Sequence, residues 1–280
     1  MSYKIYDPKP DGRGYAGLLV MLHGCGQTPE DFAAGTRMNR LADEHGFLIA
    51  YPAQSASANP MNCWNWFDAK DQDRDGGEPS LIAGITRRVA SDHRIDAGRI
   101  YVAGLSAGGA MAVILGATYP ELFAAVGIHS GLPYRAAHDA GSALRAMRGG
   151  GAPPSRAGCE ASRATPTIVF HGDADTTVDP SNGAAIVDHA VSSAERVVGP
   201  MQKICRERMS AGGRLYSTTV YHPPGARSLV EYWVVHGAGH AWSGGSPLGS
   251  FADATGPDAS AAMVRFFLER SYAESQLAYV

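Results

Sequence analysis

Short apolar runs alternate along this chain with longer segments in which apolar residues recur at helical spacing. The runs are almost free of polar residues, as expected for parallel strands that are buried on both faces. They lie at residues 17–22, 47–51, 100–103, 124–129 and 167–171. Two further strands are predicted at 216–221 and 229–235. This alternation predicts an α/β fold with a mainly parallel sheet flanked by helices on both faces.

Local signals mark the helices between these strands. Thr28 is a good N-cap and Pro29 suits the first helical position, so we expect a helix that ends near His45, before Gly46. A second helix begins at Ser80, with Leu81, Ile82, Ile85 and Val89 on one apolar stripe. Further helices are predicted at 182–210 (interrupted at Gly199-Pro200), at about 258–270 and directly after residue 108, where the small residues Gly109, Ala110, Met111 and Ala112 begin a helical pattern.

Two segments break the alternation. Residues 53–79 form a long polar loop that contains Cys63-Trp64-Asn65-Trp66-Phe67, and loops of this length usually serve function. Residues 132–164 lack any periodicity, which predicts an insertion at the sheet edge or over the site. We otherwise expect residues 1–280 to form a single domain.

Composition narrows the classes of function. The chain has 280 residues, 45% of them hydrophobic, and a net charge of −3, so no basic surface argues for a nucleic-acid partner. No apolar run approaches the ~20 residues of a membrane span, so no membrane partner is expected. The N-terminus shows no signal-peptide region. The protein is therefore either intracellular or begins after a removed segment.

Metal binding is not favoured. The four cysteines form no C-x-x-C pair, and their even number permits two disulfides without requiring any. Residues 71–76 match the first half of a calcium loop, but Ile82 stands where the chelating glutamate is needed. We interpret this segment as a solvated acidic turn and expect no metal and no cofactor.

The strongest chemical signal is the pentapeptide Gly104-Leu105-Ser106-Ala107-Gly108. It follows an apolar strand and precedes a helix of small residues, the context in which G-x-S-x-G forms a nucleophile elbow. The alternative is a glycine-rich turn with an inert serine. In this arrangement an acid and then a histidine follow the serine along the chain.

The acid and the base each have competing candidates. His240 lies in a glycine-loosened loop and is the predicted base, whereas His236 is predicted to be structural. The segment His171-Gly172-x-x-Asp175-x-x-Val178 resembles the acid loop of many serine hydrolases, which favours Asp175. Asp173 is expected to cap the turn, and Asp179 to lie at a loop-to-helix junction.

Backbone amides complete the predicted site. The loop after the first buried strand reads His23-Gly24-Cys25. In enzymes with a G-x-S-x-G nucleophile elbow, the loop after an early strand supplies one oxyanion donor, and the residue after the nucleophile supplies the other. The predicted oxyanion hole therefore consists of the amides of Cys25 and Ala107.

Several motifs together resemble the poly(3-hydroxybutyrate) depolymerase family of esterases, over about residues 15–270. These are the segments 22–27, 31–33, 63–67, 104–109, 171–175 and 239–245. The resemblance implies an α/β-hydrolase fold and a Ser106–His240–Asp175 triad. It further implies hydrolysis of short-chain hydroxyacyl esters, such as poly- or oligo(3-hydroxybutyrate), through an acyl-enzyme without a cofactor.

The same resemblance leaves alternatives open. The family is related to acetylxylan and feruloyl esterases, so a carbohydrate esterase is a second hypothesis. A third, of another class, is a non-catalytic α/β-hydrolase binding module. Secreted polymer-degrading members usually carry a polymer-binding domain, which we do not find here. We therefore expect activity on soluble or amorphous esters more than on crystalline polymer.

The long polar loop carries the last predictions. Trp64, Trp66 and Trp242 either pack in the core or form an apolar floor for the substrate, and we expect substrate binding. Cys25 and Cys63 lie in loops at the same predicted sheet edge, so we expect a disulfide between them; the alternative is two buried thiols. Such a bridge would favour a secreted or periplasmic protein. Cys159–Cys205 is a weaker candidate pair.

Overall fold

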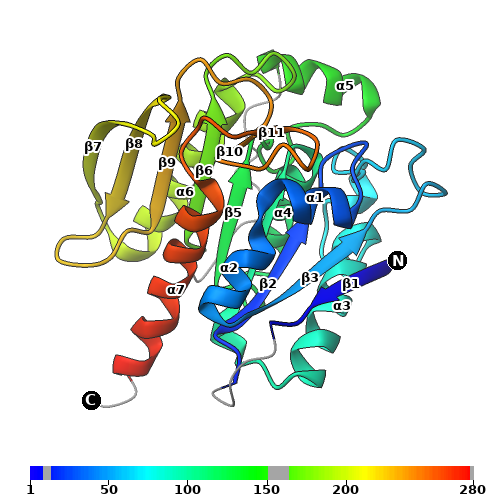
Figure 1. Ribbon diagram of the computed structural model, residues 1–280, viewed down its shortest axis with the longest axis horizontal. Coiled ribbons are helices and arrows are strands. Elements are labelled where there is room, and N and C mark those ends of the chain that lie inside the picture. The colour runs from blue at the N-terminus through cyan, green and yellow to red at the C-terminus, as the bar shows by residue number, and fades with distance from the viewer. Residues whose placement is uncertain (9–13, 151–163, 278–280) are drawn as a thin grey trace.

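A nine-stranded sheet forms the centre of the molecule, as the computed structural model shows (Figure 1). The structure describes residues 1–8, 14–150 and 164–277. The strand order is β1-β3-β2-β4-β5-β6-β9-β8-β7. The pairs from β3 to β9 are parallel, whereas β1, β8 and β7 are antiparallel additions at the two edges. The predicted mainly parallel sheet is confirmed.

The elements have the following bounds. The sheet strands are β1 Ser2–Tyr6, β2 Gly17–Leu22, β3 Phe47–Ala53, β4 Ile100–Leu105, β5 Ala125–His129, β6 Thr167–Gly172, β7 Gln202–Met209, β8 Leu215–His222 and β9 Val230–Val235. The helices are α1 Pro29–Thr36, α2 Met38–His45, α3 Gly77–Asp92, α4 Ala107–Thr118, α5 Ala140–Arg145, α6 Ser181–Val198 and α7 Ala259–Leu277. Strands β10 Trp242–Ser243 and β11 Ala252–Asp253 form a separate pair, and short helical turns occur at Ala69–Asp71, Ala97–Arg99 and Ala146–Gly150.

Apolar side chains fill both sides of the sheet. On one side α3, α4 and α6 bury residues such as Ile82, Met111 and Ile186 against the strands. On the other side α1, α2 and α7 bury Phe32 and Phe267, among others. Strands β2 and β4 are buried along their whole length because both of their faces are covered.

The predicted helix over 29–45 is wrong in one respect, because the structure divides it at Arg37. Thr28 caps α1 and Gly46 ends α2 in the left-handed conformation, as expected. Arg37 is also left-handed, with φ 54°. Its guanidinium bonds the carbonyl of Gly244, so a contact far along the chain accompanies the break.

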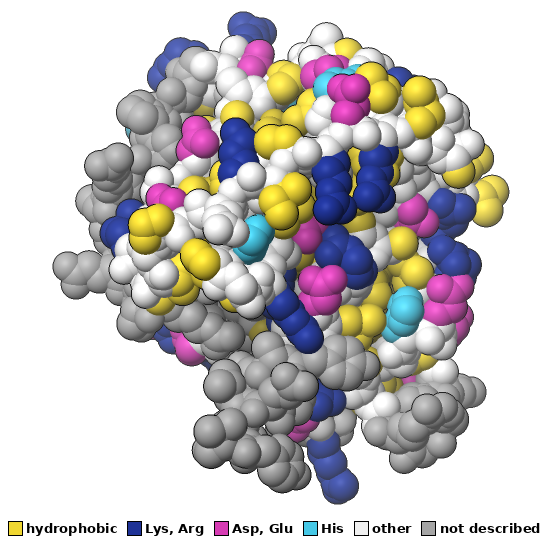
Figure 2. Space-filling model, turned by 90° about the vertical axis from the view of Figure 1, so that its left-hand side faces the viewer, with side chains coloured by type: hydrophobic (Ala, Val, Ile, Leu, Met, Phe, Trp, Pro, Cys, Tyr) yellow, Lys and Arg dark blue, Asp and Glu magenta, His cyan; other side chains and the backbone are white. Residues whose placement is uncertain are grey.

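The predicted helix over 182–210 is also wrong in its second half. Helix α6 ends before Gly199, and residues 202–209 form β7, which pairs antiparallel with β8. Every residue of β7 is exposed, and Lys203, Arg206 and Arg208 are among them. Lys and Arg side chains are prominent on the face that includes this end of the sheet (Figure 2). Charges on an edge strand hinder pairing with other chains.

The two irregular segments differ from each other. Helix α3 begins at Gly77, before the predicted Ser80, and Leu81 lies off its buried stripe with 49% of its surface exposed. The predicted insertion at 132–164 contains α5, and its residues 151–163 lie outside the described part. Among the helices of the described ranges, none combines the length and apolar character that a membrane span needs.

Candidate active site

Ser106 forms a strained turn between β4 and α4. Its φ of 56° and ψ of −119° are unusual for a residue with a side chain. The neighbouring glycines are required, because a Cβ on Gly104 would lie 2.3 Å from the carbonyl of Gly108, and one on Gly108 would lie 2.1 Å from that of Leu22. Within the described residues the Ser106 hydroxyl makes no hydrogen bond, and the residue is 9% exposed. The turn therefore holds this hydroxyl at the end of the central strand without a competing partner.

Asp175 and His240 meet at the same edge of the sheet. Asp175 follows β6 and His240 follows β9, and their Oδ2 and Nδ1 atoms are 2.7 Å apart. The other carboxylate oxygen accepts hydrogen bonds from the amides of Thr177 and Val178, each at 2.9 Å. The Asp175 side chain is fully buried, whereas that of His240 is 10% exposed. A carboxylate only accepts, so Nδ1 of His240 carries the proton and Nε2 is free to act as a base.

The protein environment keeps Asp175 ionised. Burial by itself would raise the pKa of this carboxyl, but hydrogen bonds from His171 and His240 and from the Val178 amide hold it well below its usual value. His171 Nε2 lies 3.5 Å from Asp175 Oδ2 and 2.8 Å from the carbonyl of Val178. An ionised carboxylate of this kind can orient a histidine and stabilise its charged form.

The other two candidate acids do different things. Asp173 accepts a hydrogen bond from the amide of Gly237 at 2.6 Å and also pairs with His236. Asp179 accepts from the amide of Ser181 at 2.9 Å, at the start of α6. Of the three predicted candidates, Asp175 is the one that contacts His240.

His129 connects Ser106 to the loop that carries His240. It is buried at the end of β5, and its carbonyl accepts from the amide of Ser106 at 2.9 Å. Its Nε2 accepts from the amide of Ser243 at 3.0 Å, three residues beyond His240. Burial first, and then the charges of His171 and His240, lower the pKa of His129 to about 3. It stays neutral at physiological pH and can therefore keep accepting from Ser243.

Gln27 connects the loop after β2 to the segment around Ser250. Its side-chain oxygen accepts from the amide of Gly24 at 2.8 Å. Its nitrogen donates to Asp31 at 2.9 Å and to the carbonyl of Ser250 at 3.1 Å. Within the described residues the amide of Cys25 donates no hydrogen bond inside the protein. This amide, with that of Ala107 at the start of α4, remains available for an oxyanion.

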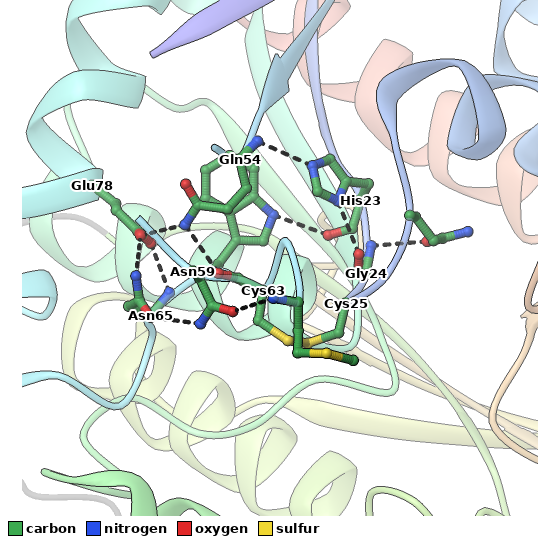
Figure 3. The surroundings of a disulfide bond; sticks show 11 residues. His23, Gly24, Cys25, Gln54, Asn59, Cys63, Asn65 and Glu78 are labelled. Atoms are coloured by element: carbon green, nitrogen blue, oxygen red, sulfur yellow. Dashed lines mark hydrogen bonds between the residues drawn. A yellow bond between two sulfur atoms is a disulfide. The ribbon is translucent and has the colours of Figure 1, made fainter. Parts of the chain in front are cut away.

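A disulfide joins Cys25 to Cys63, as predicted. It holds the long loop that carries Cys63 and Trp64 beside the loop after β2, which carries Cys25 (Figure 3). Gln54 lies between Glu78 and His23 in this view: its side-chain nitrogen bonds Glu78, and its amide donates to Nε2 of His23 at 3.2 Å. The disulfide and these hydrogen bonds thus join the loop after β2 to the loop after β3, although the two are far apart in the sequence.

Comparison with known proteins gives the family. The family model described as Esterase PHB depolymerase matches residues 1–211 of the chain. The chain belongs to the PHB depolymerase family of esterases. The matched residues include Ser106 and Asp175, whereas His240 lies beyond them.

Relatives of this PHB depolymerase family member are named as depolymerases or esterases. The chain is 32% identical over 239 residues to poly(3-hydroxyalkanoate) depolymerase C of Paucimonas lemoignei, covering 80% of this chain and 55% of that protein. It is 37% identical over 127 residues to feruloyl esterase B of Neurospora crassa, covering 45% and 42%. The chain thus spans about half the length of these relatives. The family is one of carboxylic ester hydrolases.

A solved structure supports the same fold. The acetyl xylan esterase from Aspergillus awamori superposes with a TM-score of 0.70 at 22% identity, covering 85% of this chain and 88% of that one. With its parallel sheet and flanking helices, this family member has the predicted α/β-hydrolase fold.

The tryptophan prediction needs correction. Trp64 is fully buried and its Nε1 donates to the carbonyl of His23 at 2.9 Å. Trp242 is 1% exposed and donates to the hydroxyl of Ser260 at 3.0 Å. Trp66 is 6% exposed and packs edge-on against Phe67. The burial of Trp64 and Trp242 favours the core-packing alternative for these two residues.

Two buried carboxylates of this family member were not predicted from the sequence. Asp71, predicted to lie in a solvated turn, is 1% exposed and accepts from the amide of Glu78 at 2.6 Å. Glu78 is buried as well and accepts from the amide of Asn65 at 2.8 Å. Burial raises the pKa of both carboxyl groups. Within the described ranges no group of His, Cys, Asp and Glu side chains could hold a metal ion.

Proposed function

We propose that this protein is a serine esterase with Ser106 as nucleophile, His240 as base and Asp175 as the residue that orients the base. The observation that carries the proposal is the 2.7 Å contact between His240 and a buried, ionised Asp175. This pair lies at the sheet edge where the strained turn holds Ser106.

The chemistry follows from these positions. The Ser106 hydroxyl attacks the ester carbonyl carbon while His240 Nε2 takes its proton, and His240 then gives this proton to the leaving alcohol. The amides of Cys25 and Ala107 bind the oxyanion that forms, a contribution of about 3 kcal/mol for each donor in comparable enzymes. A water molecule, activated by His240, finally hydrolyses the acyl-enzyme.

The proposed substrates are short-chain hydroxyacyl esters such as oligo- or poly(3-hydroxybutyrate). The family and the similarity to poly(3-hydroxyalkanoate) depolymerase C support this class. A carbohydrate esterase is the second candidate, supported by 37% identity to feruloyl esterase B. A binding module without activity is disfavoured because the chain carries a serine in a strained strand-to-helix turn and a histidine that contacts a buried aspartate.

Loss of the nucleophile tests the mechanism. We expect Ser106→Ala to lower p-nitrophenyl butyrate turnover by at least about 10³-fold. The nucleophile, the base and the aspartate act as a unit, so loss of one of them removes most of the acceleration that the three provide together. Circular dichroism should show an unchanged fold. A folded variant that keeps most of its activity would contradict the mechanism.

A substrate panel tests the specificity. Rates on a soluble 3-hydroxybutyrate trimer, an amorphous suspension, a crystalline film and acetylated xylan should be compared at equal enzyme concentration. We expect the trimer and the suspension to be cleaved fastest. Cleavage of acetylated xylan without cleavage of the trimer would favour the carbohydrate esterase.

We also propose that the protein works in an oxidising compartment, outside the cell or in the periplasm. The Cys25–Cys63 disulfide supports this, since such bonds rarely persist in a reducing cytosol. Counting free thiols in denatured, unreduced protein tests the bridge. Four free thiols would rule it out.

A further inference from the structure

A second serine, histidine and aspartate, none of them a member of the proposed active site, are joined by hydrogen bonds. The hydroxyl of Ser217 is 2.7 Å from Nε2 of His236. Nδ1 of His236 is 2.8 Å from Oδ2 of Asp173. The three residues come from β8, from the turn after β9 and from the loop after β6, so the fold and not a local motif brings them together.

The proton positions in this group follow from its acceptors. The Asp173 carboxylate only accepts, so Nδ1 of His236 carries the proton and Nε2 is the acceptor. The Ser217 hydroxyl therefore donates to His236. Burial would raise the pKa of Asp173, but hydrogen bonds from His236 and from the Gly237 amide hold it below its usual value.

This arrangement is both held in place and open to solvent. The second oxygen of Asp173 accepts from the amide of Gly237 at 2.6 Å, which fixes the carboxylate to the turn that carries His236. Arg214 donates to the carbonyl of His236 at 3.4 Å. The side chains of His236 and Asp173 are 31% and 41% exposed and Ser217 is half-buried, so a small reagent can reach the group.

We propose that Ser217 is a second nucleophile, which takes an acyl group from small activated esters. The Ser217 oxygen forms a bond to the carbonyl carbon, and the bond from that carbon to the leaving alkoxide breaks. The hydroxyl proton moves to Nε2 of His236 and from there to the alkoxide. Asp173 stabilises the imidazolium that forms in between.

The same geometry makes Ser217 a site of modification more than of turnover. Strand β8 lies between β7 and β9, so its amides are engaged in the sheet and do not form a pair of oxyanion donors next to Ser217. Without such donors both acylation and deacylation lose a large share of their acceleration. The acyl group on Ser217 therefore persists, in contrast to the short-lived acyl-enzyme proposed at Ser106.

The test uses the full chain carrying Ser106→Ala, treated with p-nitrophenyl acetate and followed by intact-mass and peptide mass spectrometry. We expect one acetyl group per chain on Ser217. His236→Gln and Asp173→Asn, each in the same background, should slow labelling on the order of 100-fold, the scale of lost base assistance. His222→Gln, a histidine on the same strand, serves as the matched control and should leave the rate unchanged.

Two results would overturn the proposal. One is the absence of acetyl on Ser217 in the Ser106→Ala chain. The other is labelling of Ser217 that is equally fast in the folded His236→Gln and Asp173→Asn chains, which would make it an ordinary surface hydroxyl. Ester turnover by the unaltered chain is measured separately. Failure of the esterase proposal is thus distinguishable from failure of this one.

Discussion

At the scale of single residues, carboxylates with similar sequence contexts have different surroundings. Asp175 has a fully buried side chain and contacts His240, whereas Asp179 accepts from the amide of Ser181 at the start of α6. Only the former is in a position to control a base. The difference gives a direct comparison between two aspartates four residues apart.

Asp175→Asn should lower ester turnover by about 10³-fold or more, because an amide can present its N–H to His240 and favour the wrong tautomer. Asp179→Asn should stay within about threefold of the parent, since it removes only a turn contact. Steady-state kinetics on p-nitrophenyl butyrate measures both. A severe loss of turnover for Asp179→Asn with a mild loss for Asp175→Asn would show that Asp179, and not Asp175, orients the base.

The buried imidazole of His129 makes the stability of the protein depend on pH. In the unfolded chain its imidazole takes up a proton below about pH 6.5, whereas in the native protein its pKa is lowered to about 3. Between these two values the unfolded state binds more protons, so stability falls as the pH falls. The slope is about 1.4 kcal/mol per pH unit.

We therefore expect His129→Gln to weaken this dependence. The glutamine oxygen can still accept from the amide of Ser243, and it does not titrate. Between pH 7 and pH 5 the wild type should lose about 2 kcal/mol more of its unfolding free energy than the variant does. Urea unfolding at both pH values measures this. Equal losses in the two proteins would mean that His129 is not held neutral.

At the scale of elements, the close approach of β2 to α4 determines the position of the elbow. A Cβ on Gly108 would lie 2.1 Å from the carbonyl of Leu22 and 2.6 Å from that of His23. Both contacts are with backbone, which cannot move aside as a flexible side chain can. Strand and helix would have to separate to make room, and the loop that carries Cys25 would move with them.

Gly108→Ala should therefore lower the unfolding free energy by at least about 2 kcal/mol. Gly84→Ala is the matched control, because Gly84 is an exposed helical position in α3 and a Cβ there would have nothing within 4 Å. It should raise stability by about 1 kcal/mol through helix propensity. Denaturant unfolding compares the two, and equal effects would contradict the proposed crowding.

At the scale of the whole molecule, one sheet runs without interruption from β1 at one edge to β7 at the other. A continuous sheet with helices on both faces predicts a single cooperative unfolding transition. The Cys25–Cys63 bridge constrains this unit by closing a sequence separation of 38 residues. It also fixes the loop that carries a proposed oxyanion donor.

Replacing both Cys25 and Cys63 by serine should cost about 4 kcal/mol of unfolding free energy, as chain entropy predicts for a loop of this length. Ester turnover should fall as well, because the Cys25 amide loses its anchor. Cys205→Ser, at an exposed free cysteine, is the control and should change stability by less than about 0.5 kcal/mol. A double variant as stable as the parent would show that the bridge contributes nothing.

Features that depend on short-range signals could be predicted from the amino-acid sequence alone. The apolar runs located the parallel strands, Thr28 and Gly46 located two helix ends, and the small residues around Ser106 located the strained turn. Each of these signals acts within a few residues. The bridge from Cys25 to Cys63 was predictable too, because both loops follow strands whose ends meet at one edge.

Features that depend on distant partners became clear only from the folded arrangement of the chain. Three aspartates lie within seven residues of each other, and the loop after β9 brings His240 to one of them, Asp175. Pairing with β8 made residues 202–209 a strand, and the loop around Gly244 contacts Arg37 where α1 and α2 part. Burial of Trp64 and Trp242 likewise depends on neighbours far along the chain, which no local pattern encodes.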